Sequence, residues 1–191
     1  MTKMTKMTKI EYLIFNINFL YYFQNFKMAQ EYNLTTCEKL YIMIENDTNP
    51  NLTEVVVNSK TLGPEGAKKL ATALKTNKTL KKIYLENTNI GDDGANYFAD
   101  ALLTNTTLTH LRIKNDNIGD EGANCFAAAL LVNNSLLVLE LENNTICDEG
   151  AINLATSLLS NETLMVLELE NNNISDDGKK AFDKILFSHE N

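Results

Sequence analysis

A repeat of 28 residues runs through the sequence from residue 52 to residue 191, and it constrains the fold more than any other feature. The five units follow one another without a gap and cover residues 52–79, 80–107, 108–135, 136–163 and 164–191. A period of this length is typical of solenoid proteins, in which each unit buries its apolar face against its neighbours. We therefore expect one stacked array over these residues.

The first half of each unit predicts a short strand. In the second unit, Leu80, Ile83 and Leu85 occupy the first, fourth and sixth positions. Alternation at the fourth and sixth positions places both side chains on one face of a strand. The other units carry this pattern as Leu52/Val55/Val57, Leu108/Leu111/Ile113, Leu136/Leu139/Leu141 and Leu164/Leu167/Leu169.

The second half of each unit predicts a helix. Apolar residues recur there at a spacing of three and four, as in Ala95, Phe98 and Leu102, which is the spacing of one helical face. In the last four units, acidic pairs such as Asp92 and Asp93 stand where the helix begins. Carboxylates at this end are expected to cap free backbone N–H groups and to oppose the helix dipole.

All eight glycines lie at two positions of the unit. The fifteenth position holds Gly66, Gly94, Gly122, Gly150 and Gly178, and the twelfth holds Gly63, Gly91 and Gly119. Cys147 and Ser175 take the twelfth position in the last two units. A glycine at a fixed place implies a close backbone approach or a special dihedral at the strand-to-helix turn. No glycine remains for a phosphate-binding loop.

These units resemble the leucine-rich repeats of the ribonuclease-inhibitor type. The resemblance covers residues 52–191 and implies an α/β fold, a right-handed solenoid or horseshoe of five β-strand/α-helix units. Its strands would form a concave parallel sheet, with the helices outside. That family has asparagine at the ninth position, which Asn144 and Asn172 match, whereas Lys60, Thr88 and Asp116 do not. A weaker ladder of side-chain-to-backbone bonds is therefore expected in the first three units.

The parts outside the repeats differ in kind. Residues 28–51 predict an N-terminal capping helix and turn, because Cys37, Leu40, Tyr41 and Ile44 share a helical face. Residues 1–27 form an atypical leader with lysines and many aromatic residues. An upstream extension with no folded role, a membrane-surface or import segment, and a true signal all stay open. Membrane contact is expected only if this leader is native.

The C-terminal end of the array leaves apolar residues to be covered, among them Phe182 and Ile185. The final helix is more polar than the others, so it is one candidate for a weak cap. A chain truncated after the fifth unit, or a partner docked at this end, would account for the same pattern.

Charge and residue types exclude several functional classes. The net charge of −8 disfavours nucleic acid as a partner. Three cysteines without a CxxC motif, with only His110 and His189, exclude a thiol zinc site, and no metal or cofactor is expected. Once the repeat is explained, no nucleophile–base pair remains, so we expect no enzyme and no catalytic residue. Free cysteines favour a reducing, cytoplasmic location. The oligomeric state stays open.

A narrower resemblance begins at the segment Met43–Val55 (MIENDTNPNLTEV), which looks like the entry into the repeat domain of tropomodulins and leiomodins. Residues 73–82 and 98–102 are also similar to that family. The family caps the pointed ends of actin filaments and can bind actin monomers. The resemblance therefore implies a non-catalytic protein–protein interaction module that binds actin and associates with the cytoskeleton.

The alternative is a regulatory leucine-rich repeat domain of another kind. An inhibitor, a GTPase-activator-like protein and a sensor fragment are the candidates. Such a domain would bind an unknown protein on the concave face of its sheet.

Strand side chains that point away from the core form the candidate partner-binding surface. The candidates are Lys82, Tyr84, His110, Arg112, Lys114, Val138, Glu140, Glu142, Val166, Glu168 and Glu170. They are basic in units two and three, and acidic in units four and five, where Leu137 and Met165 add apolar surface. One interpretation is a row of solvated glutamates at small cost. The other is a basic or amphipathic partner segment on the C-terminal half, whose acidic end pairs with Arg112.

Overall fold

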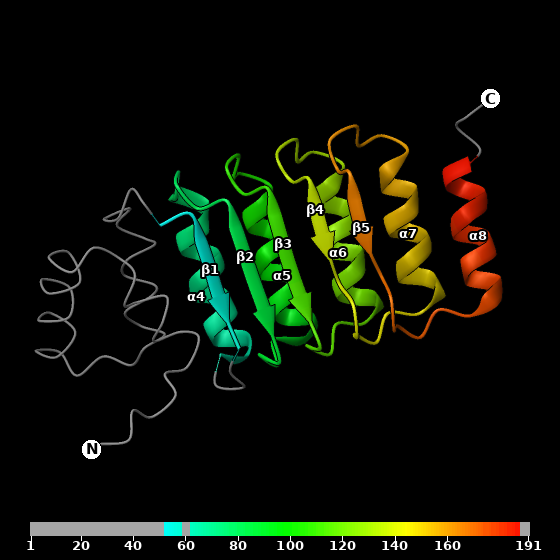
Figure 1. Cartoon of the computed structure of the whole chain (residues 1–191), viewed down its shortest axis with the longest axis horizontal. Helices are drawn as coiled ribbons and strands as arrows, with labels where there is room; N and C mark the ends of the chain where they lie inside the picture. Colours follow the sequence, from blue (N-terminus) through cyan, green and yellow to red (C-terminus); the bar gives the residue numbers. More distant parts are fainter. Residues whose placement is uncertain (1–51, 59–61, 188–191) are drawn as a thin grey trace, which may run out of the picture.

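A computed structural model describes residues 52–58 and 62–187 (Figure 1). The predicted leader (1–27) and capping helix (28–51) lie outside the described residues. The elements are β1 (Glu54–Val57), α4 (Gly63–Thr76), β2 (Lys82–Glu86), α5 (Gly91–Leu102), β3 (His110–Lys114), α6 (Asp120–Leu130), β4 (Val138–Glu140), α7 (Asp148–Leu158), β5 (Val166–Glu168) and α8 (Asp176–Phe187). The predicted alternation of one strand and one helix per unit is confirmed.

The strands form one parallel sheet in the order β1-β2-β3-β4-β5. Equivalent positions of successive units lie side by side, as Lys82, His110 and Val138 do across β2, β3 and β4. The strands make one layer and the helices the other, and the units advance along a single axis (Figure 1). This is the α/β leucine-rich repeat solenoid that the sequence predicts.

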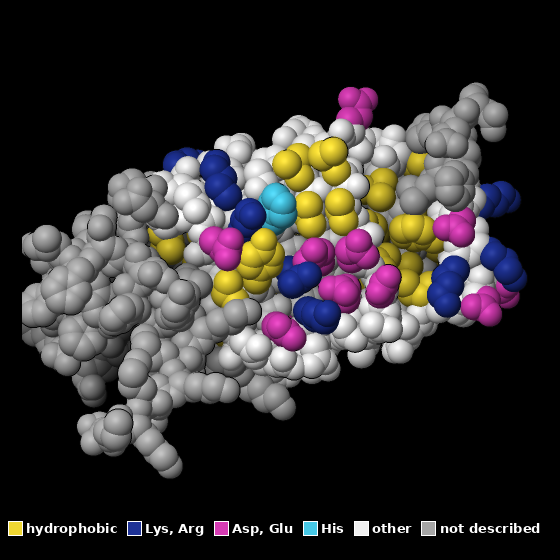
Figure 2. All heavy atoms as spheres, viewed as in Figure 1, with side chains coloured by type: hydrophobic (Ala, Val, Ile, Leu, Met, Phe, Trp, Pro, Cys, Tyr) yellow, Lys and Arg dark blue, Asp and Glu magenta, His cyan; other side chains and the backbone are white. Residues whose placement is uncertain are grey.

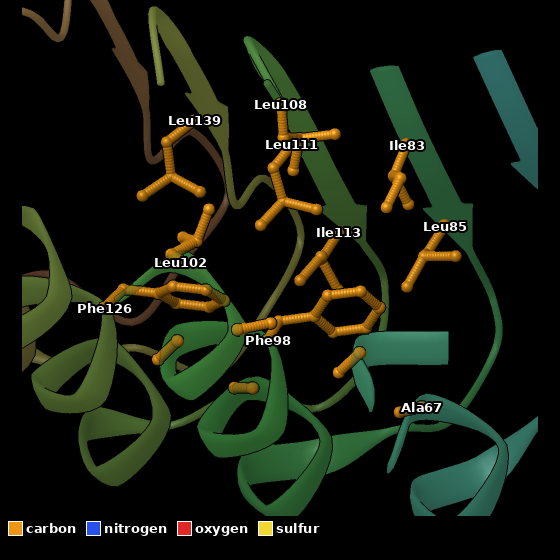
Figure 3. Packing of buried hydrophobic residues seen from close by; sticks show 14 of the residues in the cluster. Ala67, Ile83, Leu85, Phe98, Leu102, Leu108, Leu111, Ile113, Phe126 and Leu139 are labelled. Atoms are coloured by element: carbon orange, nitrogen blue, oxygen red, sulfur yellow. The ribbon is translucent and has the colours of Figure 1, made fainter. Parts of the chain in front are cut away.

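The core fills the space between the two layers. Phe98 of α5 and Phe126 of α6 are fully buried and point from the helices toward the strands (Figure 3). Leu111 and Ile113, the inward residues of β3, are also fully buried. Burying each side chain of this size contributes about 1.5–3 kcal/mol, so the repeated apolar positions supply most of the driving force for stacking.

The two glycine positions have different physical causes. At the fifteenth position the helix approaches its neighbour closely: a Cβ on Gly150 would lie 2.9 Å from the Cβ of Ala123. At the twelfth position Gly63 and Gly91 have φ of +58° and +60°, where glycine is favoured. The next two units depart from this: Gly119 and Cys147 have φ of −103° and −100°, which any residue adopts. That change of backbone explains why Cys147 can replace a glycine.

Carboxylates at the helix starts cap the next helix of the array and not their own. Oδ1 of Asp92 accepts hydrogen bonds from the backbone N–H groups of Gly119 (2.7 Å) and Gly122 (3.0 Å). Asp120 does the same for Cys147 and Gly150. Asp148 accepts from the backbone N–H and the hydroxyl of Ser175, and these bonds lower the pKa of its carboxyl. The carboxylates thus cap backbone N–H groups as predicted, but those groups belong to the following helix, so each cap binds one unit to the next.

Buried asparagines tie successive units together at the start of each strand. Nδ2 of Asn105 donates to the carbonyl oxygens of Leu74 (2.7 Å) and Asn77 (3.2 Å), both in the preceding unit. Its Oδ1 accepts from the backbone N–H of Leu108 at 2.8 Å. Asn133 and Asn161 make the equivalent bonds. Each amide therefore satisfies backbone groups that would otherwise be buried without partners.

A second ladder, at the ninth position, continues through Asp116. Oδ1 of Asn144 accepts from the backbone N–H groups of Asp116 (3.0 Å) and Ile118 (3.1 Å), while its Nδ2 donates to three carbonyls. Oδ1 of Asp116 accepts from the backbone N–H and the hydroxyl of Thr88, both at 2.7 Å. The expectation of a weak ladder at Asp116 is therefore wrong for the hydrogen bonds that its side chain accepts. Its carboxylate oxygen accepts them as the amide oxygen of an asparagine would.

The second oxygen of Asp116 stands where an asparagine would have its donating amide nitrogen. Its Oδ2 is buried and has no hydrogen-bond partner, whereas Nδ2 of Asn144 donates at 2.8 Å and 3.0 Å. Burial raises the pKa of the Asp116 carboxyl, because the charged form loses its hydration there.

The last unit is less buried than the one before it. Leu164, Leu167, Leu169 and Ile174 are half-buried, as is Phe182 of α8. In the fourth unit the equivalent residues Leu136, Leu139, Leu141 and Ile146 are fully buried. The apolar side of the fifth unit is thus partly open within the described residues, in line with the uncovered Phe182 and Ile185 expected from sequence.

Replacing Asp116 by asparagine (Asp116→Asn) should stabilise the protein at neutral pH by about 1–3 kcal/mol, because an amide supplies the missing donor. The native carboxyl binds its proton more tightly than the unfolded one. Relative to Asp116→Asn, the wild type therefore loses stability as pH rises from the unfolded pKa of this carboxyl through its raised folded pKa. Urea unfolding between pH 3 and pH 8 measures both. A gap between the proteins that stays constant with pH would contradict the role given to the carboxyl.

Gly150→Ala should destabilise the protein by about 1 kcal/mol or more, although alanine favours helices by about 1 kcal/mol. The new Cβ would lie 2.6 Å from Oδ1 of Asp120, 2.9 Å from Cβ of Ala123 and 3.0 Å from Cγ2 of Ile146. Asn96→Ala, at an exposed position of α5, is the matched control and should leave stability unchanged or raise it slightly. Thermal unfolding followed by circular dichroism compares them, and an equal rise for both would show that the close approach is unimportant.

Candidate functional site

The side chains predicted to face a partner all lie on the sheet face opposite the helices. They come from β2, β3, β4 and β5 and from the residues directly after β4 and β5. Each is half-buried or exposed, whereas their inward neighbours are buried in β2, β3 and β4. Figure 2 shows basic and acidic side chains side by side over the middle of this face. The parallel register therefore brings the predicted residues together on one surface.

The basic and acidic halves meet in ion pairs between β3 and β4. The guanidinium of Arg112 pairs through Nε with Oε2 of Glu140, and its Nη2 lies 4.0 Å from Oε2 of Glu142. The ammonium of Lys114 lies 3.5 Å from the same Glu142 oxygen. These groups are partly exposed, so each pair contributes only about 0–1 kcal/mol. Their main effect is to neutralise the boundary between the two halves.

Arg112 is therefore not free in the way the sequence suggested. The sequence interpretation placed a partner's carboxylate on this residue, whereas the structure pairs it with Glu140 of the same chain. The guanidinium also stacks near Tyr84, with its central carbon 5.7 Å from the ring centroid. Tyr84, Arg112 and Glu140 thus form a connected row across three strands.

Glu168 and Glu170 differ from the glutamates beside them. Glu168 lies next to Glu140 in the β4–β5 register, where like charges repel. Within the described part of the chain, neither Glu168 nor Glu170 has a cation at ion-pair distance. The fifth unit thus carries two uncompensated carboxylates on the sheet face.

Apolar side chains adjoin these carboxylates toward the start of the same strands. Met165 is 79% exposed and Val166 is 37% exposed, and Leu137 and Val138 beside them are half-buried. The first three units carry Thr53, Lys81 and Thr109, or Glu54, Lys82 and His110, at these two positions. The repeat itself therefore does not require apolar residues here.

A groove lined by asparagines lies at the other end of the strands, and sequence reasoning missed it. Asn87, Asn89, Asn115 and Asn117 line a space of about 400 Å³. All four have φ between 54° and 60°, which asparagine tolerates better than most residues. Nδ2 of Asn117 donates to Oδ1 of Asn89 at 3.1 Å. The recurrence of asparagine at the eighth and tenth positions of units two and three is the signal that could have identified this groove.

His110, one of the predicted sheet-face residues, contacts the residue before it. His110 has Nδ1 at 2.8 Å from the hydroxyl of Thr109. No group of three or more His, Cys, Asp or Glu residues in 52–58 and 62–187 could hold a metal ion. No helix in these same ranges is long and apolar enough to cross a bilayer. The arrangement of strand side chains is suited to contact with another surface.

Several solved structures are similar to this chain, and two of them show what kind of domain it resembles. One is described as the actin-binding site 2 (ABS2) of Leiomodin-1, with 27% identity and a TM-score of 0.68, covering 80% of this chain and 88% of that chain. The other is the tropomodulin C-terminal domain of Caenorhabditis elegans, with 20% identity and a TM-score of 0.67, covering 80% of this chain and 92% of that chain. The second likeness concerns the fold alone.

The sequence also matches a family model. No curated protein matches the chain. The model described as Leucine Rich repeat matches residues 48–71, 76–99, 104–127, 132–155 and 160–182. These matches recur with the period of the structural units and cover more than half of the sequence. The chain belongs to the leucine-rich repeat family.

Proposed function

We propose that this chain is a non-catalytic interaction module that binds actin and slows growth at the pointed ends of actin filaments. The main support is its likeness to the actin-binding site 2 of Leiomodin-1, at 27% identity over 80% of this chain. The resemblance of Met43–Val55 to the entry of the tropomodulin and leiomodin repeat domain points the same way. The proposal places the protein with the cytoskeleton in the cytoplasm.

The sheet face is the surface that we assign to the partner. A parallel sheet backed by packed helices holds its side chains in fixed positions, which lowers the entropic cost of ordering them on binding. Both charged and apolar side chains lie on this face, whereas the opposite side of the sheet is filled by the core. A protein surface is therefore a better fit for this face than a small molecule.

The proposal predicts slower pointed-end growth in an assay of pyrene-labelled actin. Filaments capped at their fast-growing ends should elongate more slowly when micromolar protein is added. Glu140→Lys/Glu168→Lys reverses two charges on the sheet face and should weaken the effect. Glu149→Lys/Glu162→Lys makes the same change of charge at exposed positions outside that face and should act like the wild type.

The outcome separates the two candidate functions. Circular dichroism of each variant shows whether the fold is kept. Unchanged elongation with the wild-type protein, together with no co-sedimentation with filaments, would refute the actin proposal. The protein would then stand as a regulatory leucine-rich repeat domain with another partner. A loss of effect in the control variant equal to that in the sheet-face variant would remove the sheet face as the binding surface.

A further inference from the structure

We propose that the sheet face of the last two units is a docking site for an amphipathic helix of a partner protein, with one basic face and one aliphatic face. The site is the acidic–aliphatic patch, defined here as Leu137, Val138, Met165, Val166, Glu168 and Glu170. This inference rests on the proposed interaction function and adds the chemistry of the partner segment.

The repeat provides an internal control for the apolar part of the patch. The second and third positions of a unit point outward from the sheet, so nothing in the core selects their side chains. In the first three units these positions hold threonine, lysine, glutamate or histidine. Only the last two units carry aliphatic residues there, and Met165 leaves 79% of its surface exposed. Exposed apolar surface that the fold does not require is typical of a binding site.

The charged residues of the patch predict that the partner segment is positively charged. Arg112 and Lys114 pair with Glu140 and Glu142, so these four groups are largely neutralised within the chain. Glu168 and Glu170 have no such cation among the described residues, and Glu168 lies beside Glu140. Lysines or arginines from a partner would pair with Glu168 and Glu170 and so offset the repulsion between the neighbouring carboxylates.

The geometry favours a helix that crosses the strands. Neighbouring strands lie about 4.8 Å apart, so equivalent side chains of β4 and β5 repeat at nearly the spacing of helix residues three or four apart, about 5–6 Å. Along each strand, positions three and five are about 7 Å apart. One stripe of the helix would then lie over Val138 and Val166, and the next stripe would lie over Glu168, beside the Arg112–Glu140 pair.

Binding of three synthetic peptides of about 18 residues, roughly 27 Å as helices, tests the proposal. The first is a lysine–leucine peptide with amphipathic helical spacing. The second has the same composition in an order that makes no apolar face. The third is a glutamate–leucine peptide with the spacing of the first. Fluorescence anisotropy at 0.15 M salt should show binding of the first, at least tenfold weaker binding of the second, and none of the third.

Variants of the full chain locate the site. Glu168→Lys/Glu170→Lys should weaken binding of the lysine–leucine peptide about tenfold or more. Met165→Thr/Val166→Thr should weaken peptide binding several-fold. Threonine is already present at the equivalent of position 165 in the first and third units, so the fold should accept it. Glu149→Lys/Glu162→Lys keeps the net charge of the first variant and should bind like the wild type.

Several outcomes would overturn the inference. Equal binding of the two lysine peptides would mean that only the overall negative charge of the chain attracts them. An equal loss of affinity in both charge variants would mean the same. Unchanged affinity in the threonine variant would remove the aliphatic face from the site. Peptide binding without any effect on actin would refute the proposed actin function alone, whereas an effect on actin without peptide binding would refute this inference alone.

Discussion

Hydrogen bonds between side chains and the backbone of the neighbouring unit are the interaction on which this structure depends. Asn105 and its equivalents bond carbonyls of the unit before, and Asp92 and its equivalents bond N–H groups of the unit after. Because these groups are fixed at one position per unit, they allow only one register and one repeat length. The apolar core supplies most of the stabilising free energy, and the polar ladders add directional bonds that only one alignment of the units satisfies.

The same register gives the protein its outer surface. Once equivalent positions are aligned, each outward strand position becomes a row across the sheet, and the side chain at each unit can vary without disturbing the core. The row Tyr84, Arg112, Glu140, Glu168 shows how such variation produces a change from aromatic to basic to acidic. The proposed function therefore rests on the positions that the repeat leaves unspecified.

Much of the fold could be predicted from the sequence, because the period, the strand and helix spacing and the glycine positions all repeat. The residues of the sheet face could also be predicted, since the register follows from the period. The pairing of Arg112 with Glu140 could not, because either residue could equally have met a partner's charge. The cap that Asp92 forms on the next helix could not be predicted either, nor could the left-handed backbone conformation of the groove asparagines. Both depend on how the loops of adjacent units meet, which spacing alone does not specify.

The half-buried core of the fifth unit has a thermodynamic consequence for any ligand of the sheet face. A unit with fewer buried side chains opens locally at a lower free-energy cost than those inside the array. A ligand that binds only the folded form of this unit must offset that cost. Its apparent affinity is therefore its intrinsic affinity multiplied by the fraction of molecules in which the unit is folded. Residues such as Leu167 and Phe182 would thus tune affinity from the far side of the sheet. Ligand binding would in turn make the end of the array as persistent as its middle.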